Sequence, residues 1–259
     1  MKNSPTPKPK SSIKVGTVIR LGDHVLGCGD ARDQAFVSKV LNGSKVNLVL
    51  VDVPYGVGYV ENKADFQTIS KGKVIANDHI QSESEYIRFT HEWLYAVKPH
   101  LTRKNAVYIF NSDKMIFALR EGMKDAGFTF AQLLVWIKNH SVLGRMDYLP
   151  QHELIAYGWH GTHEFMKSKD KSLLFYPKPN KSKLHPTQKP VGLLRKLILN
   201  SSRIGDVVYD SFGGSGSTLM AAEQTRRKCV MIEIDPEYCQ TIVERFEKLT
   251  GIKAIKIYG

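Results

Sequence analysis

Residues 207–233 read VVYDSFGGSGSTLMAAEQTRRKCVMIE, and the order of residue types in this stretch decides the fold. An apolar run ends at Asp210, a glycine-rich turn follows, and a helix-competent segment begins at Ser217. A second apolar run ends at Glu233. This order predicts a strand, a tight turn, a helix and a second strand, the first unit of a nucleotide-binding α/β sheet.

The turn favours a ligand that contains adenosine. Three glycines, Gly213, Gly214 and Gly216, allow positive φ and leave room for a ligand close to the backbone. The first amides of the following helix point outward without partners. Glu233 lies about twenty residues beyond the turn, the usual spacing of an acid that binds ribose hydroxyls.

The same turn argues against two commoner nucleotide ligands. Its GGSGST sequence differs from the G-x-G-x-x-G pattern of dinucleotide sites, which disfavours an oxidoreductase, and no G-x-x-x-x-G-K-[ST] loop for ATP occurs. Asp210 places a carboxylate just before the turn, where a positively charged ligand group fits. S-adenosyl-L-methionine (S-adenosylmethionine) has an ammonium group and no phosphates, so we expect it as the cofactor.

Composition sets the class of protein. The 259 residues suit one large α/β domain, and the net charge of +12 favours a polyanionic partner such as DNA. The sequence has no long apolar run and no recognisable export signal, so we expect a cytoplasmic protein without a membrane span. Three cysteines, Cys28, Cys229 and Cys239, form no C-x-x-C pair, which predicts neither a disulfide framework nor a metal site.

A second acidic strand end lies in the first half of the chain. The apolar run 46–51 predicts a parallel strand buried on both faces, and it ends at Asp52. Too few residues follow Val207 to complete a sheet, so the first half must supply the remaining strands. Asp52 and Asp210 are therefore expected to face one crevice, one toward the substrate and one toward the cofactor.

Hydrophobic periodicity predicts the other elements. Strands are expected as a hairpin within 15–29 and at 106–110, 129–137, 154–157 and 253–258. Helices are expected at 34–41, 82–97, 114–126, 191–201 and 236–249.

Three regions are polar. Residues 1–12 predict a flexible basic tail, and residues 56–78 are a candidate lid over the site. Residues 160–189 are lysine-rich with interleaved aromatics. That composition suits contact with phosphates, but it is also typical of a solvated surface.

Three motifs follow one another along the chain: DVPY at 52–55, HPTQKPVGLL at 185–194 and DSFGGSG at 210–216. Together they resemble the DNA amino-methyltransferases that use S-adenosylmethionine, in the motif order of the β-group. The resemblance implies a Rossmann-like, seven-stranded, mostly parallel sheet with one antiparallel strand and a circularly permuted motif order. It also implies one methyltransferase domain over 13–259, with target-recognition insertions near 56–78 and 139–184.

The resemblance also implies roles for individual residues. The catalytic tetrapeptide, which would hold the target base, is Asp52, Val53, Pro54 and Tyr55. The residues implied to hold the cofactor's adenine, ribose and methionine are Asp30, Ala31, Thr187, Lys189, Asp210, Phe212, Gly213, Gly214, Ser215, Gly216, Ser217 and Glu233. Trp136, Lys138, His152 and Glu153 are similar to family positions without a defined role.

One position departs from the family pattern. Val53 stands where the family usually has proline. The implied contact there is the backbone carbonyl, which valine keeps, and Pro54 still biases Val53 toward an extended conformation. We expect methyl transfer to survive at a reduced rate, and the alternative is an inactive DNA-binding relative.

The implied reaction is methylation of an exocyclic amine in duplex DNA whose target base is flipped out of the stack. Adenine N6 is the preferred target and cytosine N4 the second, while an RNA or protein methyltransferase stays open as a third class. Methylation at cytosine carbon-5 is disfavoured because the chain has no Pro-Cys. Both a monomer and a homodimer suit the sequence, and a restriction–modification system is the implied context.

Overall fold

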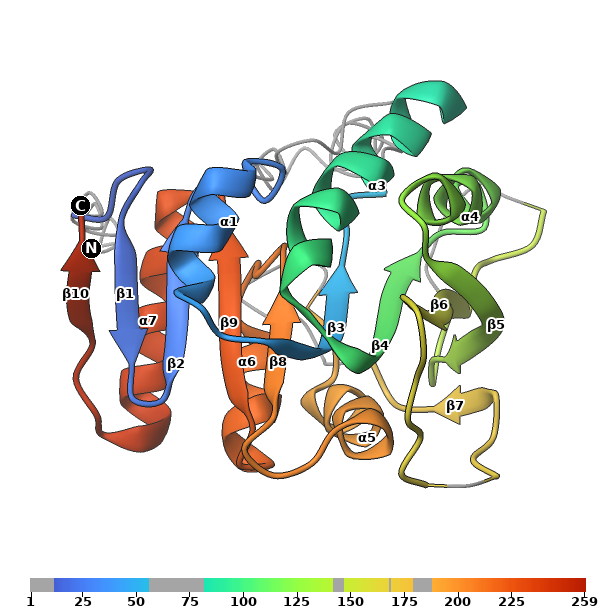
Figure 1. The fold of residues 1–259 in the computed structure, drawn as a ribbon. Helices are drawn as coiled ribbons and strands as arrows, with labels where there is room; N and C mark the ends of the chain where they lie inside the picture. Colours follow the sequence, from blue (N-terminus) through green and yellow to red (C-terminus); the bar gives the residue numbers. More distant parts are fainter. Residues whose placement is uncertain (1–11, 56–81, 142–146, 168, 179–187) are drawn as a thin grey trace, which may run out of the picture.

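The structure is a computed structural model that describes residues 12–55, 82–141, 147–167, 169–178 and 188–259 (Figure 1). The strands are β1 (Val18–Leu21), β2 (His24–Cys28), β3 (Val46–Asp52), β4 (Leu101–Asn111), β5 (Thr129–Ile137), β6 (His152–Trp159), β7 (Leu173–Phe175), β8 (Val207–Asp210), β9 (Lys228–Glu233) and β10 (Ile255–Tyr258). The helices are α1 (Gln34–Leu41), α3 (Glu83–Val97), the 3₁₀ helix η1 (Lys98–His100), α4 (Ile116–Asp125), α5 (Val191–Ser201), α6 (Ser217–Gln224) and α7 (Pro236–Thr250).

All described strands form one sheet in the order β10-β1-β2-β9-β8-β3-β4-β6-β5-β7. The strands from β2 to β4 run parallel, β6 is antiparallel to both β4 and β5, and β1 is antiparallel to both β2 and β10. The seven strands from β2 to β5, with β6 reversed, match the predicted sheet. The sheet has more strands than the seven implied by the resemblance. β10, β1 and β7 extend it at its edges to ten strands, and β1 is a second reversed strand.

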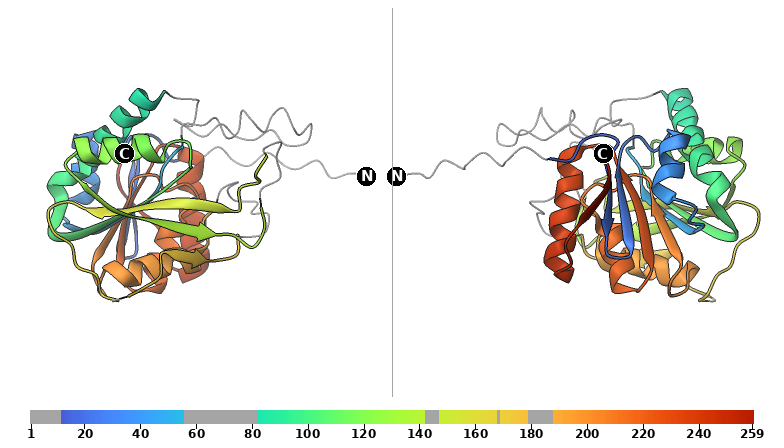
Figure 2. Two further views of the ribbon diagram at one scale, coloured as in Figure 1. Left: turned by 90° about the vertical axis from the view of Figure 1, so that its right-hand side faces the viewer. Right: turned by 60° about the vertical axis from the view of Figure 1, so that its left-hand side comes forward.

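Helices cover both faces of the sheet, as the two side views show (Figure 2). One hydrophobic core lies under α1, α3 and α4, and a second lies under α5, α6 and α7. The apolar strand β3 has core side chains on both faces because its alternate residues belong to the two cores. The fold is therefore a three-layer α/β arrangement, as predicted.

Local sequence explains where the helices begin. Ser82 and Glu85 form a capping box at the start of α3. Asp33 caps α1, and Asp235, followed by Pro236, caps α7. These signals agree with the predicted starts of all three helices.

The predicted elements are present, with different ends in several cases. β4 begins at Leu101, well before the predicted residue 106. Leu101 pairs with Val46, the register then shifts, and the polar residues 102–105 hid this part of the strand from the pattern analysis. The short strand β7 lies in the lysine-rich region, where charge hid it from the pattern analysis. Residues 1–11, 56–81, 142–146, 168 and 179–187 lie outside the described part, so most of the predicted tail, the predicted lid and part of the second insertion do too.

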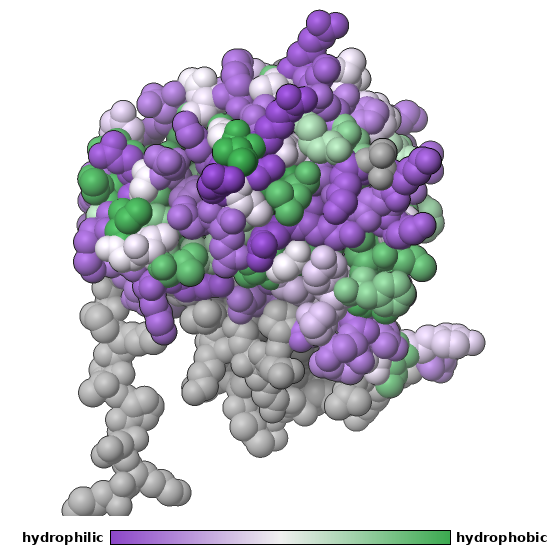
Figure 3. Space-filling view, turned by 90° about the horizontal axis from the view of Figure 1, so that it is seen from below, coloured by the Kyte–Doolittle hydropathy of each residue, from purple (hydrophilic) through white to green (hydrophobic). Residues whose placement is uncertain are grey.

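The carboxyl ends of the parallel strands lie along one side of the sheet, and their amino ends lie along the opposite side. In Figure 1 the parallel strands point upward, so their carboxyl ends meet at the upper edge. The lower face shows small hydrophobic groups separated by hydrophilic residues (Figure 3).

None of the helices in the described ranges combines the length and apolar character needed to cross a membrane.

Candidate active site

One cavity opens at the upper edge of the sheet, where five parallel strands end. It is lined by residues of both halves of the chain, among them Asp30, Ala31, Asp52, Val53, Pro54, Tyr55, Lys189, Asp210, Phe212, Gly213, Gly214, Ser215, Ser217 and Glu233. Asp52 and Asp210 lie at the ends of β3 and β8, which are neighbours in the sheet. The structure therefore brings together nearly all of the predicted site residues. Thr187 lies outside the described residues.

The glycine turn packs tightly against strand β9 and helix α7. The amide of Gly213 donates to the carbonyl of Ile232 at 2.8 Å, and a Cβ at Gly213 would lie 2.7 Å from Met231. Gly216, with φ of 80°, faces Ile242 of α7 and, unlike the other predicted turn residues, does not line the cavity. Glycine is required at these two positions because the turn has no room for side chains.

A side chain of α7 also fixes the turn. Arg245 donates from Nη1 to the backbone oxygen of Ser215 and to its Oγ at 3.1 Å. This contact was not predicted, since Arg245 has no special spacing within the helical pattern of α7.

Glu233 links the end of β9 to the glycine turn. Its Oε2 accepts a hydrogen bond from the amide of Gly214 at 2.6 Å, and its Oε1 accepts one from the amide of Asp235 at 2.8 Å. Burial raises the pKa of Glu233 to about 7, although both amide bonds act in the opposite direction. The carboxyl group is thus held in place and titrates near neutrality.

Asp210 is almost completely buried at the end of β8. Its Oδ1 accepts a hydrogen bond from the amide of Phe212 at 3.0 Å. Burial raises the pKa of Asp210 to about 7, while hydrogen bonds from Thr218 and Phe212 lower it. Beyond it, Gly216 caps α6 without a side-chain hydrogen bond, and the Ser217 hydroxyl has no partner among the described residues.

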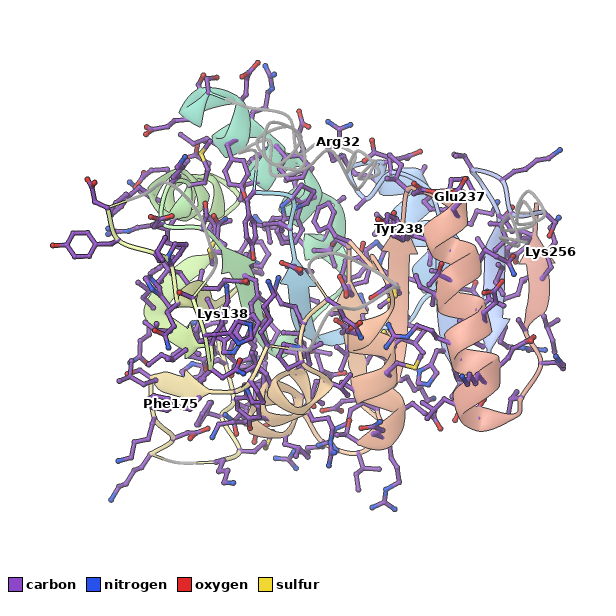
Figure 4. The ribbon with its side chains drawn as sticks, turned by 180° about the vertical axis from the view of Figure 1, so that it is seen from behind. Arg32, Lys138, Phe175, Glu237, Tyr238 and Lys256 are labelled. Carbon is purple, nitrogen blue, oxygen red and sulfur yellow. The ribbon has the colours of Figure 1, made fainter. Side chains whose placement is uncertain are left out.

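Asp30 lies beyond β2 at the other end of the cavity. Arg32 donates to it through the backbone amide at 2.9 Å and through Nη2 at 2.7 Å. Burial alone would raise the pKa of Asp30, but Arg32 lowers it. Figure 4 shows Arg32 and Tyr238 at this same upper edge, and Tyr238 lines the cavity.

The tetrapeptide DVPY is held by a side chain of α3. Tyr86 donates its hydroxyl hydrogen to the carbonyl of Pro54 at 3.1 Å, and Asn111 donates to the Tyr86 hydroxyl at 2.8 Å. Val53 is buried, with 3% of its surface exposed. Tyr86 was predicted only as a core residue, because periodicity does not reveal where a buried hydroxyl points.

Asp52 faces the cavity and is hydrogen-bonded on both oxygens. Its Oδ1 accepts from the Tyr55 hydroxyl at 3.1 Å, and its Oδ2 lies 2.6 Å from the Lys189 Nζ. Burial raises the pKa of Asp52, Lys189 lowers it, and Glu153 raises it further. Lys189 was expected on the methionine side of the cofactor, and in the structure its Nζ contacts Asp52 of the DVPY tetrapeptide.

Two more charged residues complete this group. Glu153, at the start of β6, accepts from Lys189 at 3.1 Å and from Lys138 at 2.9 Å. Burial alone would raise the pKa of Glu153, but the two lysines lower it to about 2. Lys138 follows β5, in the half of the molecule opposite Tyr238 (Figure 4). The sequence marked Lys138 and Glu153 as family-like without showing that they meet.

Comparison with known proteins identifies the family. A family model described as DNA methylase, for N6 and N4 methyltransferases, matches residues 46–244. The chain belongs to this family. It is an S-adenosylmethionine-dependent DNA methyltransferase of the N6/N4 type.

Curated relatives and solved structures agree with this assignment. The chain is 28% identical over 239 residues to the type II methyltransferase M.HpaI of Haemophilus parainfluenzae, covering 81% of this chain and 70% of the relative. It is 24% identical to the type II methyltransferase M2.MboI of Moraxella bovis, covering 81% and 83%.

Two structures show the same fold. The complex of M1.HpyAVI with S-adenosylmethionine matches with a TM-score of 0.63 and 24% identity, over 85% of this chain and 98% of that one. The cytosine-N4-specific PvuII DNA methyltransferase matches with a TM-score of 0.65 and 18% identity, over 87% and 89%. The predicted fold class and family are confirmed.

Proposed function

We propose that this methyltransferase flips a target base out of duplex DNA and methylates its exocyclic amine, at adenine N6 in the first place and at cytosine N4 in the second. The observation that carries the proposal is the single cavity that contains both the tetrapeptide Asp52–Tyr55 and the glycine turn. The likeness to a cytosine-N4-specific enzyme is the reason to keep the second target.

The residues of the cavity fit S-adenosylmethionine. Glu233 and Asp210 present carboxyl groups, which suit the hydroxyl and ammonium donors of this cofactor. Residues 210–217 contain no lysine or arginine that could bind phosphates. The uncapped start of α6 and the unpartnered Ser217 hydroxyl are free to receive an acidic group such as the methionine carboxylate.

We assign the cofactor contacts accordingly. Glu233 accepts from the ribose, Asp30 and Ala31 hold the adenine, and Asp210 with the turn holds the methionine end. Thr187 keeps its predicted place on the methionine side in this proposal. Lys189, predicted beside it, is assigned to Asp52, which its Nζ contacts at 2.6 Å. The cofactor supplies an electrophilic methyl group bound to a sulfonium.

The tetrapeptide prepares the amine of the target base. The amine is a poor nucleophile because its lone pair is delocalised into the ring. In our proposal Asp52 and the carbonyl of Val53 accept the two amine hydrogens, which favours a tetrahedral nitrogen and stabilises its developing positive charge. Asp52 then accepts the proton that the methylated amine loses, and Tyr55 stacks on the flipped base.

The test is a direct product analysis. Purified protein is incubated with methyl-labelled S-adenosylmethionine and unmethylated duplex DNA, and the digested nucleosides are separated. Label in N6-methyladenine supports the first target, and label in N4-methylcytosine moves the proposal to the second. No label, with cofactor binding shown by calorimetry, would replace the proposal with an inactive DNA-binding protein, and Val53→Pro would then be tested for restored transfer.

A further inference from the structure

Four charged side chains and one phenol form a compact group behind the target-base position. This charge cluster comprises Asp52, Tyr55, Lys138, Glu153 and Lys189. Its two lysines are each 5% exposed, whereas Glu153 is 18% and Asp52 27% exposed. Buried lysines of this kind are retained only when carboxylates compensate their charge. The two positive charges of the lysines balance the two negative charges of the carboxylates.

The cluster has a defined order of contacts. It runs from Asp52 to Lys189 (2.6 Å), from Lys189 to Glu153 (3.1 Å) and from Glu153 to Lys138 (2.9 Å). The Tyr55 hydroxyl lies 3.1 Å from Asp52 and 3.0 Å from Glu153. Lys189 thus stands between two carboxylates, and only one of them, Asp52, is in the tetrapeptide.

Rigid elements position each member of the cluster. Lys189 precedes Pro190, which caps α5 and restricts the lysine backbone. Glu153 is paired with Trp136 across the antiparallel strands β5 and β6, and the amide of Lys138 donates to Gln151 at 2.8 Å. Glu153 is therefore fixed within β6, while Lys138 directly follows β5 and Lys189 lies just before α5.

The cluster answers a chemical requirement of the proposed reaction. Asp52 must be ionised to accept both an amine hydrogen and, later, the proton that the amine loses, because a protonated carboxyl carries a donor on one of its oxygens. Burial and the negative charge of Glu153 both oppose the ionised form of Asp52. Lys189 is the cation in direct contact with it. An ionised carboxylate has about four acceptor positions, so the Lys189 and Tyr55 contacts leave positions for the amine.

We infer that Lys189 is a positioning residue that keeps Asp52 ionised and ready to accept the target amine, and that Glu153, held by Lys138, limits how tightly Lys189 grips Asp52. The inference rests on the proposed function, in which Asp52 contacts the amine. It assigns Glu153 and Lys138 a part in methyl transfer although neither contacts the amine.

The inference predicts opposite effects for two substitutions. In Lys189→Met, Asp52 loses its cation, so the acid limb of kcat/KM for DNA moves to higher pH. In Glu153→Gln, a negative neighbour is lost and Lys189 has a single carboxylate partner, so the limb moves to lower pH while the KM for DNA rises. Lys189→Arg keeps the charge and retains a limb close to that of the unmodified protein.

The experiment measures kcat/KM for a methylatable duplex from about pH 5.5 to about pH 9 in all variants. If the acid limb moves one pH unit higher, kcat/KM at acidic pH falls approximately tenfold, and the difference disappears at high pH. Lys196→Met is the matched control. Lys196 forms an ion pair with Asp170, with an N–O distance of 2.9 Å, and neither residue lines the cavity. The pH profile of kcat/KM for Lys196→Met should match that of the unmodified protein.

A second readout does not require turnover. Fluorescence of a 2-aminopurine duplex, recorded with S-adenosylhomocysteine present, reports base flipping, and its pH midpoint should shift in the same directions. A loss in Lys189→Met that is equal at every pH would overturn the inference and leave a structural role. If Lys189→Met does not fold, an unmoved limb in Glu153→Gln overturns it. Absence of transfer by the unmodified protein at every pH would instead refute the proposed function.

Discussion

The hydroxyl of Tyr86 donates to the carbonyl oxygen of Pro54 at 3.1 Å, so helix α3 holds the backbone of the DVPY tetrapeptide. The same hydroxyl accepts from Asn111 at the end of β4. One buried oxygen therefore joins the helical layer, the sheet and the segment proposed to contact the target base.

The first prediction concerns this oxygen. Tyr86→Phe leaves the Pro54 carbonyl and the Asn111 amide without a partner, which costs about 1–3 kcal/mol of unfolding free energy. We expect kcat to fall while the affinity for S-adenosylhomocysteine is retained. Denaturant unfolding, steady-state kinetics and calorimetry measure the three quantities. An unchanged kcat would show that the tetrapeptide keeps its shape without the hydroxyl.

Asp52→Ala removes the proposed acceptor of the amine hydrogen. Loss of one preorganised polar contact of this kind lowers the rate about 100-fold to 1,000-fold. Cofactor affinity should change little, since the cofactor contacts are assigned to the other half of the cavity. Methyl transfer at the unmodified rate would exclude Asp52 from catalysis.

Glu233→Gln tests the ribose contact. The substitution removes the charge that would accept from the ribose hydroxyls, and hydrogen bonds to charged groups contribute about 1.5–3 kcal/mol. We expect S-adenosylhomocysteine to bind roughly tenfold to 100-fold more weakly, with kcat at saturation nearly retained. Glu247→Gln, on the outside of α7, is a control that should bind normally. Equal affinity in the two variants would remove Glu233 from the ribose site.

Cofactor binding should depend on pH near neutrality. Glu233 and Asp210 have pKa values raised to about 7, so both are largely protonated at roughly pH 6 and ionised at roughly pH 8. The ionised forms accept the cofactor's donors, so affinity should rise over this range and binding should release protons. Calorimetry in buffers of different ionisation enthalpy measures the release. Proton uptake would contradict the assignment.

The stability of the free protein should change in the opposite sense. A carboxyl whose pKa is raised in the folded state binds its proton more tightly there than in the unfolded chain. The stabilisation is complete below the ordinary pKa of the carboxyls and is lost as pH rises through about 7. Thermal unfolding without cofactor should therefore show a falling Tm over this range, and Glu233→Gln should reduce the slope.

Arg245→Met tests the support of the glycine turn. Without Arg245 the backbone oxygen of Ser215 loses its partner, and we expect a several-fold higher KM for S-adenosylmethionine with kcat nearly unchanged. Arg203→Met is the control, because Arg203 forms an exposed ion pair with Glu164 at 2.6 Å, and such pairs contribute little. If both variants have the same KM, the turn does not need Arg245.

Sequence patterns predicted the order of the elements because β3, β8 and β9 are strongly apolar and the glycine turn is distinctive. They placed Asp52, Asp210 and Glu233 at one edge, since carboxyl ends of parallel strands coincide. Sequence patterns also predicted the edge strands β1 and β10, within 15–29 and at 253–258, whereas the count of seven strands came from the family resemblance. The short strand β7 was not predicted, because it lies in the lysine-rich region.

The charge cluster required the structure for a topological reason. Glu153 lies at the beginning of a strand, and a strand start belongs at the opposite edge unless that strand is reversed. Only the antiparallel pairing of β6 with β4 and β5 brings Glu153 to the carboxyl ends of its neighbours. Lys189 was among the predicted site residues and lines the cavity, but its contact with Glu153 depends on this reversal, which no local pattern encodes.

The order of the sheet has a consequence for biosynthesis. β2 and β3 leave the ribosome well before β8 and β9, yet the β9–β8 pair separates them in the sheet. Until those residues emerge, one edge of β3 and one edge of β2 lack their hydrogen-bonding neighbours. Such open edges are prone to pair with other chains. Rapid synthesis of residues 207–233, or a chaperone, would therefore protect the nascent protein from aggregation, and the proposed cofactor site is complete only after Glu233 has been added.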